Sequence, residues 1–172
     1  MPTIPLDLNR TAAEYLSNSA RWFPNLHADA LGAAVHFALG LSGEIGELVE
    51  LVAFTEPGDP TDPSLGEELA DVTIYSLDLG GVLGLDLDAG FELAAEQASG
   101  LWPDLVIAAG LVCNITKKLN RGDAVEVEQL ARLVCRLLAE CFEFALAERI
   151  DLLAEMTSKV AVCETRWGGP RG

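Results

Sequence analysis

The sequence predicts an all-α fold, and three observations support this fold class. From Leu130 to Ala145 the apolar side chains recur every three or four residues, which is the spacing of one face of an amphipathic helix. No stretch of comparable length alternates apolar and polar residues with the period of two that a half-buried strand requires. The residues that break helices are gathered at a few positions, which leaves long uninterrupted segments between them. Because 50% of the 172 residues are hydrophobic, the chain can bury a sizeable core.

In chain order, the apolar spacing and the breaks between the segments predict seven helices. The first ends before Pro24, and the proline-rich segment 56–63, expected to be a surface loop, separates the second from the third. Trp102-Pro103 ends the fourth, Arg121-Gly122-Asp123 ends the fifth, and Gly168 ends the seventh. The expected helices are residues 10–22, 30–52, 64–83, 87–101, 105–119, 125–146 and 152–167.

Acidic residues outnumber basic ones, and the excess lies in the first part of the chain. The net charge is −16, and residues 1–103 hold 17 acids and two bases, whereas residues 104–172 hold 10 acids and nine bases. A chain this acidic lacks the basic surface that binds a nucleic-acid backbone, and it lacks the basic amphipathic helix that binds an anionic membrane. We therefore expect neither a nucleic-acid polymer nor a membrane among its partners. The acids of the first part form either a solvated surface or a site for cations.

Neither a membrane span nor a signal peptide is expected. No uncharged apolar run approaches the ~18 residues of a membrane span, and the first residues lack a basic segment followed by an apolar one. All four cysteines lie in the second part without a CxxC pair, so we expect buried reduced thiols rather than a zinc site or disulfides. These features predict a cytoplasmic protein.

A weak internal repeat is visible at an offset of 65 residues. Asp86 and Trp102 align with Asp151 and Trp167, and apolar positions between them align as well. Apolar spacing in helical proteins also produces such matches by chance, which is the alternative explanation. If the repeat is real, the chain consists of two fused helical units, the second packed against the first. Their ranges are residues 1–103 and 104–172.

Two acidic pairs with helical spacing lie on neighbouring predicted helices. Glu44 and Glu47 are three residues apart, as are Glu68 and Asp71, so each pair projects from one face of its helix beside apolar residues. Antiparallel helices ~8–10 Å apart would bring the four carboxylates together. Such hard oxygen ligands suit Mg²⁺, with Mn²⁺ as an alternative. The other interpretation is a solvated acidic face, because an ExxE pair alone is common on helix surfaces.

These residues carry a resemblance to a known family. The strings Gly43-Glu-Ile-Gly-Glu-Leu48 and Glu68-Leu-Ala-Asp-Val72, followed by Tyr75, resemble the signature of the MazG-like, all-α nucleoside triphosphate pyrophosphohydrolases, which include the dimeric dUTPases. The resemblance covers roughly residues 13–103 and implies a four-helix-bundle unit. It also implies that four carboxylates are the catalytic metal ligands: Glu44, Glu47, Glu68 and Asp71.

The family pattern is divided between the two predicted units. Family members end the fourth helix with a Lys, an Asn and an Arg-aromatic pair; the first unit lacks these bases, whereas the second has Lys159 and Arg166. Conversely, the metal-ligand positions of the second unit are occupied by Asn114, Lys117, Leu133 and Arg136. We infer that the first unit supplies the metal site and the second supplies basic groups for phosphate. Lys117, Arg136, Lys159 and Arg166 are the candidates, and the alternative for Lys117 and Arg136 is that they pair with nearby acids.

The resemblance implies hydrolysis of a (d)NTP to (d)NMP and pyrophosphate, in which Mg²⁺ activates a water that attacks the α-phosphorus. Many relatives carry a further glutamate immediately before the first ligand, which orients this water, but the residue here is Gly43. The alternative function is therefore a non-catalytic module of the same fold that binds metal, nucleotide or a partner.

A nucleobase needs a flat apolar surface with a few polar groups. Tyr75 matches a family position, and Trp22, Phe23, His27 and His36 come from segments that flank the site in relatives. The candidate substrate-binding residues are thus Tyr75, Lys159, Arg166, Lys117, Trp22 and His36. A homodimer is an alternative to a monomer.

Overall fold

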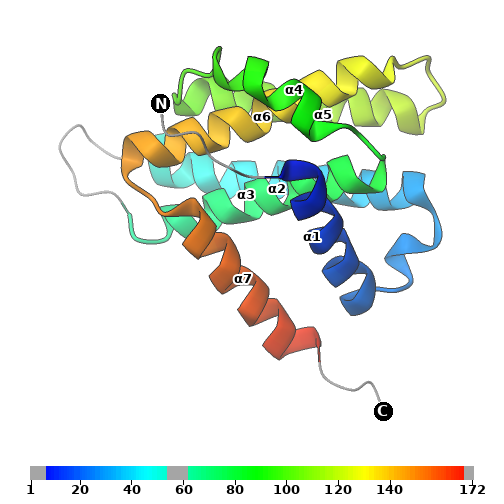
Figure 1. Ribbon diagram of the computed structural model, residues 1–172, viewed down its shortest axis with the longest axis horizontal. Coiled ribbons are helices and arrows are strands. Elements are labelled where there is room, and N and C mark those ends of the chain that lie inside the picture. Colours follow the sequence, from blue (N-terminus) through cyan, green and yellow to red (C-terminus); the bar gives the residue numbers. More distant parts are fainter. Residues whose placement is uncertain (1–6, 54–61, 169–172) are drawn as a thin grey trace.

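The computed structural model describes residues 7–53 and 62–168, and within these ranges the regular structure is entirely helical (Figure 1). This confirms the all-α prediction. Residues 54–61 lie outside the described residues, and with them most of the predicted proline-rich surface loop. The elements are α1 (Leu8–Trp22), η1 (Leu26–Ala28), α2 (Ala30–Ala53), α3 (Leu65–Val82), α4 (Leu87–Ala95), α5 (Trp102–Asn120), α6 (Val127–Glu148) and α7 (Leu152–Trp167).

Three of the helices begin at an aspartate. The side chains of Asp7, Asp86 and Asp151 accept a hydrogen bond from the backbone N–H three residues further on, at the starts of α1, α4 and α7. Such a cap satisfies an N–H group that has no partner inside the helix. The two aspartates that align in the sequence repeat, Asp86 and Asp151, therefore have the same local role in α4 and α7.

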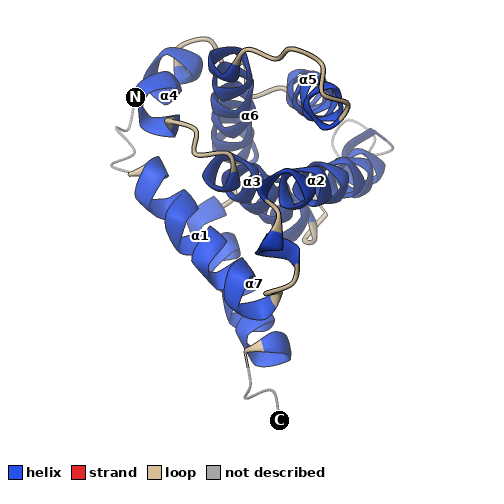
Figure 2. Cartoon of the chain, turned by 90° about the vertical axis from the view of Figure 1, so that its right-hand side faces the viewer, coloured by secondary structure: helices blue, strands red, loops and turns tan. Residues whose placement is uncertain are grey.

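The helix α3 is the centre of the fold. It packs against α1, α2, α6 and α7, and Figure 2 shows it between α6, α2 and α1. Eleven of its 18 residues are buried. Most side chains of α3 therefore face either another helix or a cleft between helices, and its buried or partly buried acids Glu68, Asp71 and Asp78 need an explanation.

Two sets of helices share a packing pattern. The pair α2 and α3 carries α1 on α3, and the pair α5 and α6 carries α4 on α6; contacts of α2 with α5 and of α3 with α6 join the two sets. The helix α7 packs on α3, and in Figure 1 it extends away from the upper layer of α4, α5 and α6. A helix from residues 104–172 thus lies against the helices of residues 1–103.

The helix α4 is shorter than predicted, because it ends at Ala95 rather than near residue 101. Beyond Ala95 the chain turns, and the backbone N–H groups of Ser99 and Gly100 donate to Oε2 of Glu140 at 3.0 and 3.1 Å. Gly100 has φ +66°, a conformation that favours glycine. A carboxylate from α6 thus takes the place of the next helical turn.

The helix α5 begins three residues earlier than predicted. Trp102 is its first residue and Pro103 lies in its first turn. Proline is tolerated there, because the first N–H groups of a helix have no intrahelical acceptor and the ring fixes φ near the helical value. Trp102-Pro103 is therefore a helix start as well as a break.

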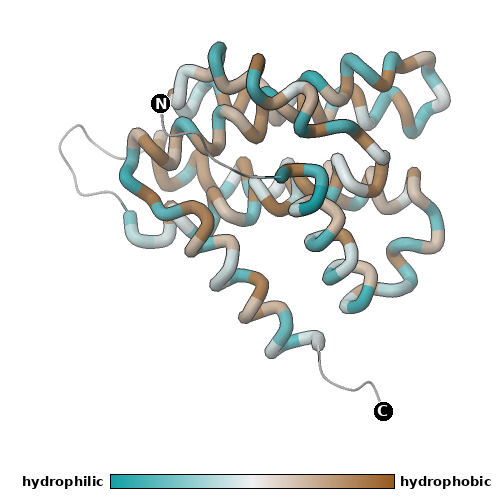
Figure 3. Tube along the Cα trace, in the orientation of Figure 1, coloured by the Kyte–Doolittle hydropathy of each residue, from teal (hydrophilic) through white to brown (hydrophobic). Residues whose placement is uncertain are grey.

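A single apolar core joins both halves of the chain. Buried leucines from α2, α3, α5 and α6 belong to one contiguous cluster, and Figure 3 shows apolar residues recurring along these helices. All four cysteines are free thiols, and Cys135 and Cys141 are buried. Within the described ranges, no helix combines the length and the apolar character that a membrane crossing needs.

Candidate metal and substrate site

Three carboxyl groups from α2 and α3 converge at one place. Glu68 and Asp71 lie one turn apart on α3, and Glu44 lies opposite them on α2. One oxygen atom from each side chain lies within 4.8 Å of the others, and all three residues are partly buried. The fourth predicted ligand, Glu47, is exposed one turn further along α2 and is not a member of this group. The structure thus brings together three of the four predicted metal ligands, here called the acidic triad.

Burial and mutual repulsion raise the pKa values of the acidic triad. The pKa of Glu44 is raised to about 7 by burial, and then by the negative charges of Asp71, Glu47 and Glu68. Burial, followed by Glu47 and Asp71, also raises the pKa of Glu68. Glu47 is therefore close enough to act on the triad electrostatically. A divalent cation would remove this repulsion, since an opposite charge favours the ionised form of a carboxyl group.

One basic side chain reaches the triad, and it comes from α7. The Nζ atom of Lys159 lies 2.5 Å from Oδ2 of Asp71. Burial lowers the pKa of Lys159, but the hydrogen bond and the charge of Asp71 outweigh this effect, so that the pKa is raised overall. The lysine is therefore a cation, and it balances only one of the three carboxylates. The structure places this residue of the second predicted unit beside the acidic residues of the first.

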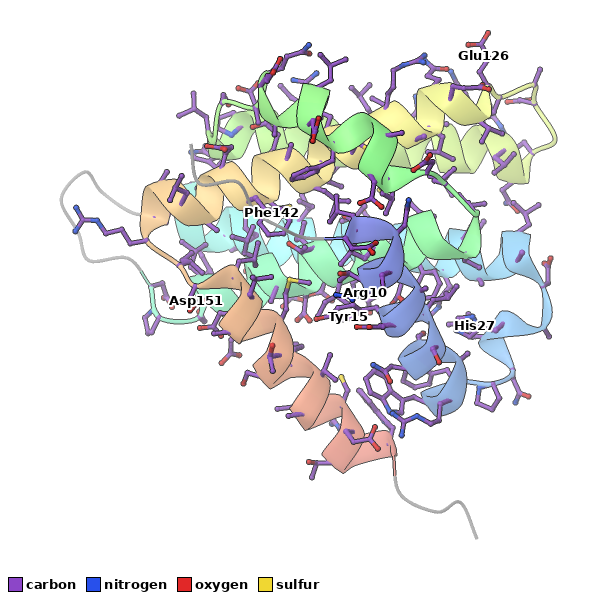
Figure 4. All side chains as sticks on the ribbon, viewed as in Figure 1. Arg10, Tyr15, His27, Glu126, Phe142 and Asp151 are labelled. Carbon is purple, nitrogen blue, oxygen red and sulfur yellow. The ribbon has the colours of Figure 1, made fainter. Side chains whose placement is uncertain are left out.

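A cleft of about 460 Å³ opens beside the triad, between α1, η1, α2, α3 and α7. Glu44, Asp71 and Lys159 lie at its polar end. Figure 4 shows Tyr15 on the side of α1 that faces α7. Most of the remaining wall is aromatic or apolar, including Tyr15, Trp22, Phe23, Leu26, Phe37, Ile74, Tyr75 and Trp167. Flat apolar walls with a charged end suit a ligand that has both a planar ring and an ionic group.

The position of Tyr75 depends on a glycine of the facing helix. A Cβ atom on Gly40 would lie 2.5 Å from a ring carbon of Tyr75, so the absence of a side chain on α2 leaves space for the ring. The ring also packs against Phe37, with centroids 6.4 Å apart. Burial, followed by the charges of Glu44 and Asp71, raises the pKa of the Tyr75 hydroxyl. Tyr75 therefore connects the triad to the aromatic wall, as a neutral hydrogen-bonding group.

The far ends of α1 and α7 are tied together by Glu164. Its two carboxylate oxygens accept bonds of 2.7 Å from both terminal nitrogens of Arg21, and Oε2 accepts a third, of 2.9 Å, from Nε1 of Trp22. The Trp167 ring, three residues further along α7, packs edge-on against Phe23 at 5.2 Å. These contacts fix two walls of the cleft relative to each other. The sequence contained no signal for them, because the partners are more than 140 residues apart.

Asp78 is a cleft residue that the sequence reasoning missed. It lies two turns beyond Asp71 on α3, lines the cleft and is only 5% exposed. Its Oδ1 atom has no hydrogen-bond partner within residues 7–53 and 62–168, and burial raises the pKa of the carboxyl group to about 7. The available signal was its spacing, since Asp71, Tyr75 and Asp78 follow one another along one face of a helix.

The other predicted substrate residues are divided between the cleft and the surface. Trp22 and His36 line the cleft, and Trp22 is buried whereas His36 is exposed. His27 is not part of the wall; its ring hydrogen-bonds the hydroxyl of Ser19 at 3.1 Å. Arg166 is exposed on α7, where its guanidinium lies 5.2 Å from the centre of the Trp167 ring. It therefore reaches the cleft only through the tryptophan on which it packs.

Two predicted phosphate contacts lie elsewhere. Lys117 is exposed on α5 and lines a separate groove between α2 and α5. Arg136 lies on α6 with its Nε 3.9 Å from Oε1 of Glu140. For Arg136 the structure thus shows pairing with a nearby acid, which was the alternative to substrate contact, and Lys117 does not line the cleft that holds the triad.

Comparisons with known proteins add no relative: no family model, curated protein or solved structure matches the chain. The functional interpretation therefore depends on the sequence pattern and on the geometry of the cleft.

Proposed function

We propose that the protein is a Mg²⁺-dependent nucleoside triphosphate pyrophosphohydrolase, which converts a (d)NTP to (d)NMP and pyrophosphate, with Mn²⁺ as an alternative metal. The observation that carries the proposal is the polar end of the cleft. Glu44 and Asp71 of the acidic triad line the cleft there together with Lys159, which pairs with Asp71, and the adjoining walls are aromatic. A metal-bound polyphosphate that carries a planar base matches both halves of this cleft.

The acidic triad fits a divalent cation by its donor set and by its charge. Carboxylate oxygens are hard ligands, and Mg²⁺ in proteins commonly takes one or a few of them and completes its shell with water and phosphate oxygens. The triad atoms, all within 4.8 Å of one another, leave room for such additional ligands. A bound cation supplies positive charge for the phosphates and lowers the pKa of water. Glu47, exposed one turn away, is available to a second cation or to water.

Lys159, which pairs with Asp71, is the candidate contact for a phosphate group. In the ligand-free protein it forms an ion pair with Asp71. When Asp71 serves a metal, the ammonium group becomes available at the polar end of the cleft, where a phosphate oxygen is the natural partner. Its position on α7 then explains how residues 104–172 contribute to a site whose acids come from residues 1–103.

The resemblance to the MazG-like pyrophosphohydrolases supports the same conclusion from the sequence. We propose in addition that the chain arose by duplication of a four-helix unit. The aspartate caps of α4 and α7 and the packing of α4 on α6 and of α7 on α3 favour this history. In that case α4 and α7 have exchanged places, because each packs on a helix of the other unit. One unit keeps the acidic triad, and the other keeps the lysine.

The alternative, a module that binds metal and nucleotide without catalysis, is favoured by Gly43. In relatives a glutamate at this position orients the attacking water, and the glycine here has no side chain. Among the described residues beyond its own helix backbone, no atom lies within 4 Å of the place that a Cβ atom on Gly43 would occupy. If the protein is an enzyme, Glu47 or a water held by the triad must orient the nucleophile.

Incubation with Mg²⁺ and a panel of standard and modified (d)NTPs tests the proposal. We expect monophosphate and pyrophosphate as products, and a loss of kcat of at least ~100-fold in Asp71→Asn and Glu68→Gln, because the metal contacts act in the transition state. The matched control is Glu128→Gln, an exposed acid on α6. Unchanged turnover in the triad variants would refute the assignment.

Thermal unfolding separates the enzyme from the binding module. Mg²⁺ that binds only the folded protein at 100 times its Kd stabilises it by about 2.7 kcal/mol. The enzyme and the non-catalytic module both predict this rise in Tm with Mg²⁺. Both also predict that Glu44→Gln abolishes it. Only the enzyme also releases pyrophosphate. A Mg²⁺-dependent Tm without any product would therefore favour the non-catalytic module, and the absence of both effects would remove the metal site itself.

A further inference from the structure

Asp78 and the acidic triad lie at two levels of one helix. Seven residues separate Asp71 from Asp78, which corresponds to about 10 Å along the axis of α3 at the helical rise of 1.5 Å per residue. Tyr75 lies between them, and all three side chains line the cleft. A ligand whose charged end is at the triad and whose body follows the aromatic wall therefore extends toward Asp78. An extended nucleotide has this shape, with its phosphates at one end and its base at the other.

One oxygen of the buried Asp78 carboxyl group lacks a partner among the residues that the structure describes. The side chain is 5% exposed, its Oδ1 atom accepts no hydrogen bond from these residues, and Lys159 of the cleft is engaged with Asp71. Burial raises the pKa of two nearby groups, Tyr15 on α1 and Tyr75 on α3, and the charge of Asp78 adds to this rise. Neither tyrosine is a cation that could balance the carboxylate. A buried carboxylate without compensation is costly, so the neutral form of the group is favoured over a wider pH range than in a solvated aspartate. Burial raises its pKa to about 7 accordingly.

A neutral carboxyl group is a bifunctional hydrogen-bonding group. Its O–H donates and its C=O accepts, side by side. The complementary partner is a planar edge in which a ring nitrogen adjoins an exocyclic amino or carbonyl group, one donating and the other accepting. Nucleobases present such edges, and the aromatic walls of the cleft offer surfaces on which the ring can stack.

We propose that Asp78 is the base-reading residue of the site, and that its carboxyl group forms paired hydrogen bonds with the ring-nitrogen edge of the nucleobase. This inference rests on the proposed function for the presence of a nucleotide. It adds the substrate class: nucleotides whose ring-nitrogen edge is unmodified are bound, and nucleotides alkylated at that nitrogen are rejected. Rejection follows because a methyl group both removes one hydrogen bond and leaves the buried carboxyl group unpaired.

Equilibrium binding tests this role without any need for hydrolysis. Trp22 and Trp167 line the cleft, so their fluorescence reports on nucleoside monophosphates added with Mg²⁺. The four standard deoxynucleoside monophosphates are titrated first, and then the tightest of them is compared with its analogue methylated at the ring nitrogen. For the wild-type protein we expect methylation to raise Kd by roughly 10- to 100-fold, the range that one unpaired buried polar group produces.

Variants at position 78 show whether this carboxyl group is responsible. In Asp78→Leu the unmodified nucleotide and its methylated analogue should bind with the same Kd, close to that of the methylated nucleotide on the wild type. The reason is that leucine cannot form the paired hydrogen bonds with the base. In Asp78→Asn the preference should remain within a few-fold, since an amide also places a donor beside an acceptor. The control is Glu126→Leu, which removes an exposed acid at the edge of the molecule, away from Tyr15 (Figure 4). Circular dichroism verifies that each variant is folded.

Each outcome decides between the two proposals. If Asp78→Leu discriminates against the methylated nucleotide as strongly as the wild type, the base-reading role is wrong, whether or not the protein hydrolyses nucleotides. Wild-type binding that ignores methylation, or the absence of any nucleotide binding, overturns the role as well. Base-selective binding that depends on Asp78, without hydrolysis of any (d)NTP, refutes the proposed enzyme and leaves the base-reading residue in place.

Discussion

The junction of α4, α5 and α6 and the cleft between α1, α3 and α7 each bury one carboxyl group, and they surround it differently. Glu140 is 1% exposed, and its Oε2 accepts bonds from the backbone N–H groups of Ser99 and Gly100, while Arg136 lies 3.9 Å from Oε1. Asp78 is 5% exposed, and the part of the chain that the structure describes provides its Oδ1 with no hydrogen bond. The two carboxyl groups are thus buried to nearly the same extent, but Glu140 has several hydrogen-bond donors and Oδ1 of Asp78 has none among the described residues.

The difference teaches how to recognise a buried acid that the fold needs. At the junction, the turn after α4 is shaped around the Glu140 carboxylate, so the acid closes a gap in the backbone hydrogen bonding. In the cleft, none of the described residues donates a hydrogen bond to Oδ1 of Asp78, and burial of this oxygen destabilises the native state. An acid of the first kind stabilises the native state, whereas one of the second kind destabilises it. Substitution at the two positions should therefore change stability in opposite directions.

The largest effect is expected at the junction. Glu140→Ala removes the acceptor of the backbone N–H groups of Ser99 and Gly100, each of which costs about 1–3 kcal/mol when it is buried and unpaired. We expect the free energy of unfolding to fall by about 4 kcal/mol, with Tm roughly 10 °C lower. Urea denaturation at pH 7.5 measures this.

The control for this variant is Glu128→Ala, which removes an exposed acid from the same helix. It should change the free energy of unfolding by less than about 0.5 kcal/mol, as surface substitutions usually do. An equal, small effect of both variants would mean that water satisfies the loop N–H groups as well as Glu140 does. The contrast between the two regions would then be lost.

The second largest change in the free energy of unfolding is expected at Asp78, and it is an increase. Asp78→Asn should stabilise the protein at pH 8, because it removes a group that must ionise in a site without a cation. The shift to a pKa of about 7 sets a ceiling of about 4 kcal/mol, and we expect about 2 kcal/mol because water and side chains relax around the charge. The measurement is the difference in free energy of unfolding between the variant and the wild type.

The pH dependence of that difference identifies its cause. A carboxyl group whose folded pKa is raised binds its proton more tightly in the folded than in the unfolded state between about pH 4 and pH 7. The contribution of Asp78 to the free energy of unfolding of the wild type therefore falls as the pH rises from about 4 to about 7. The extra stability of Asp78→Asn relative to the wild type grows over the same range and levels off above about pH 7. Glu44, whose pKa is also about 7, titrates in both proteins and cancels in the difference. An advantage that does not change with pH would point to packing instead of ionisation.

The same contrast explains which parts of the molecule could be predicted from the sequence. The helices follow from apolar spacing and capping residues, which are local, and most of their bounds agree with the predicted ones within about three residues. Glu44, Glu68 and Asp71 were also accessible, since helical spacing fixes each face and a single loop joins the two helices. Lys159 was found through its resemblance to a family position on a helix of the other unit.

What the sequence could not provide is the set of partners that come from distant segments. The end of α4 at Ala95 depends on Glu140, about 40 residues away, and propensity alone continued the helix to residue 101. Asp78 stands in an apolar helix face, and only the packed structure shows that no donor reaches its Oδ1. Lys117 aligned with a metal-ligand position yet lies in another groove, because alignment says nothing of the direction that an exposed side chain takes.

The smallest effect is expected at an exposed acid that has many partners. Glu164 accepts three hydrogen bonds from Arg21 and Trp22, as many as Glu140 receives from its loop, but it and Arg21 are open to solvent. Solvent screens such a pair, and ordering two long side chains costs entropy, so Arg21→Met should leave Tm without a measurable change. It should instead raise KM for the preferred nucleotide a few-fold, because α7 and its Trp167 are held less firmly against α1. A fall in Tm comparable to that of Glu140→Ala would show that the number of partners, and not their burial, decides what a carboxylate contributes to the fold.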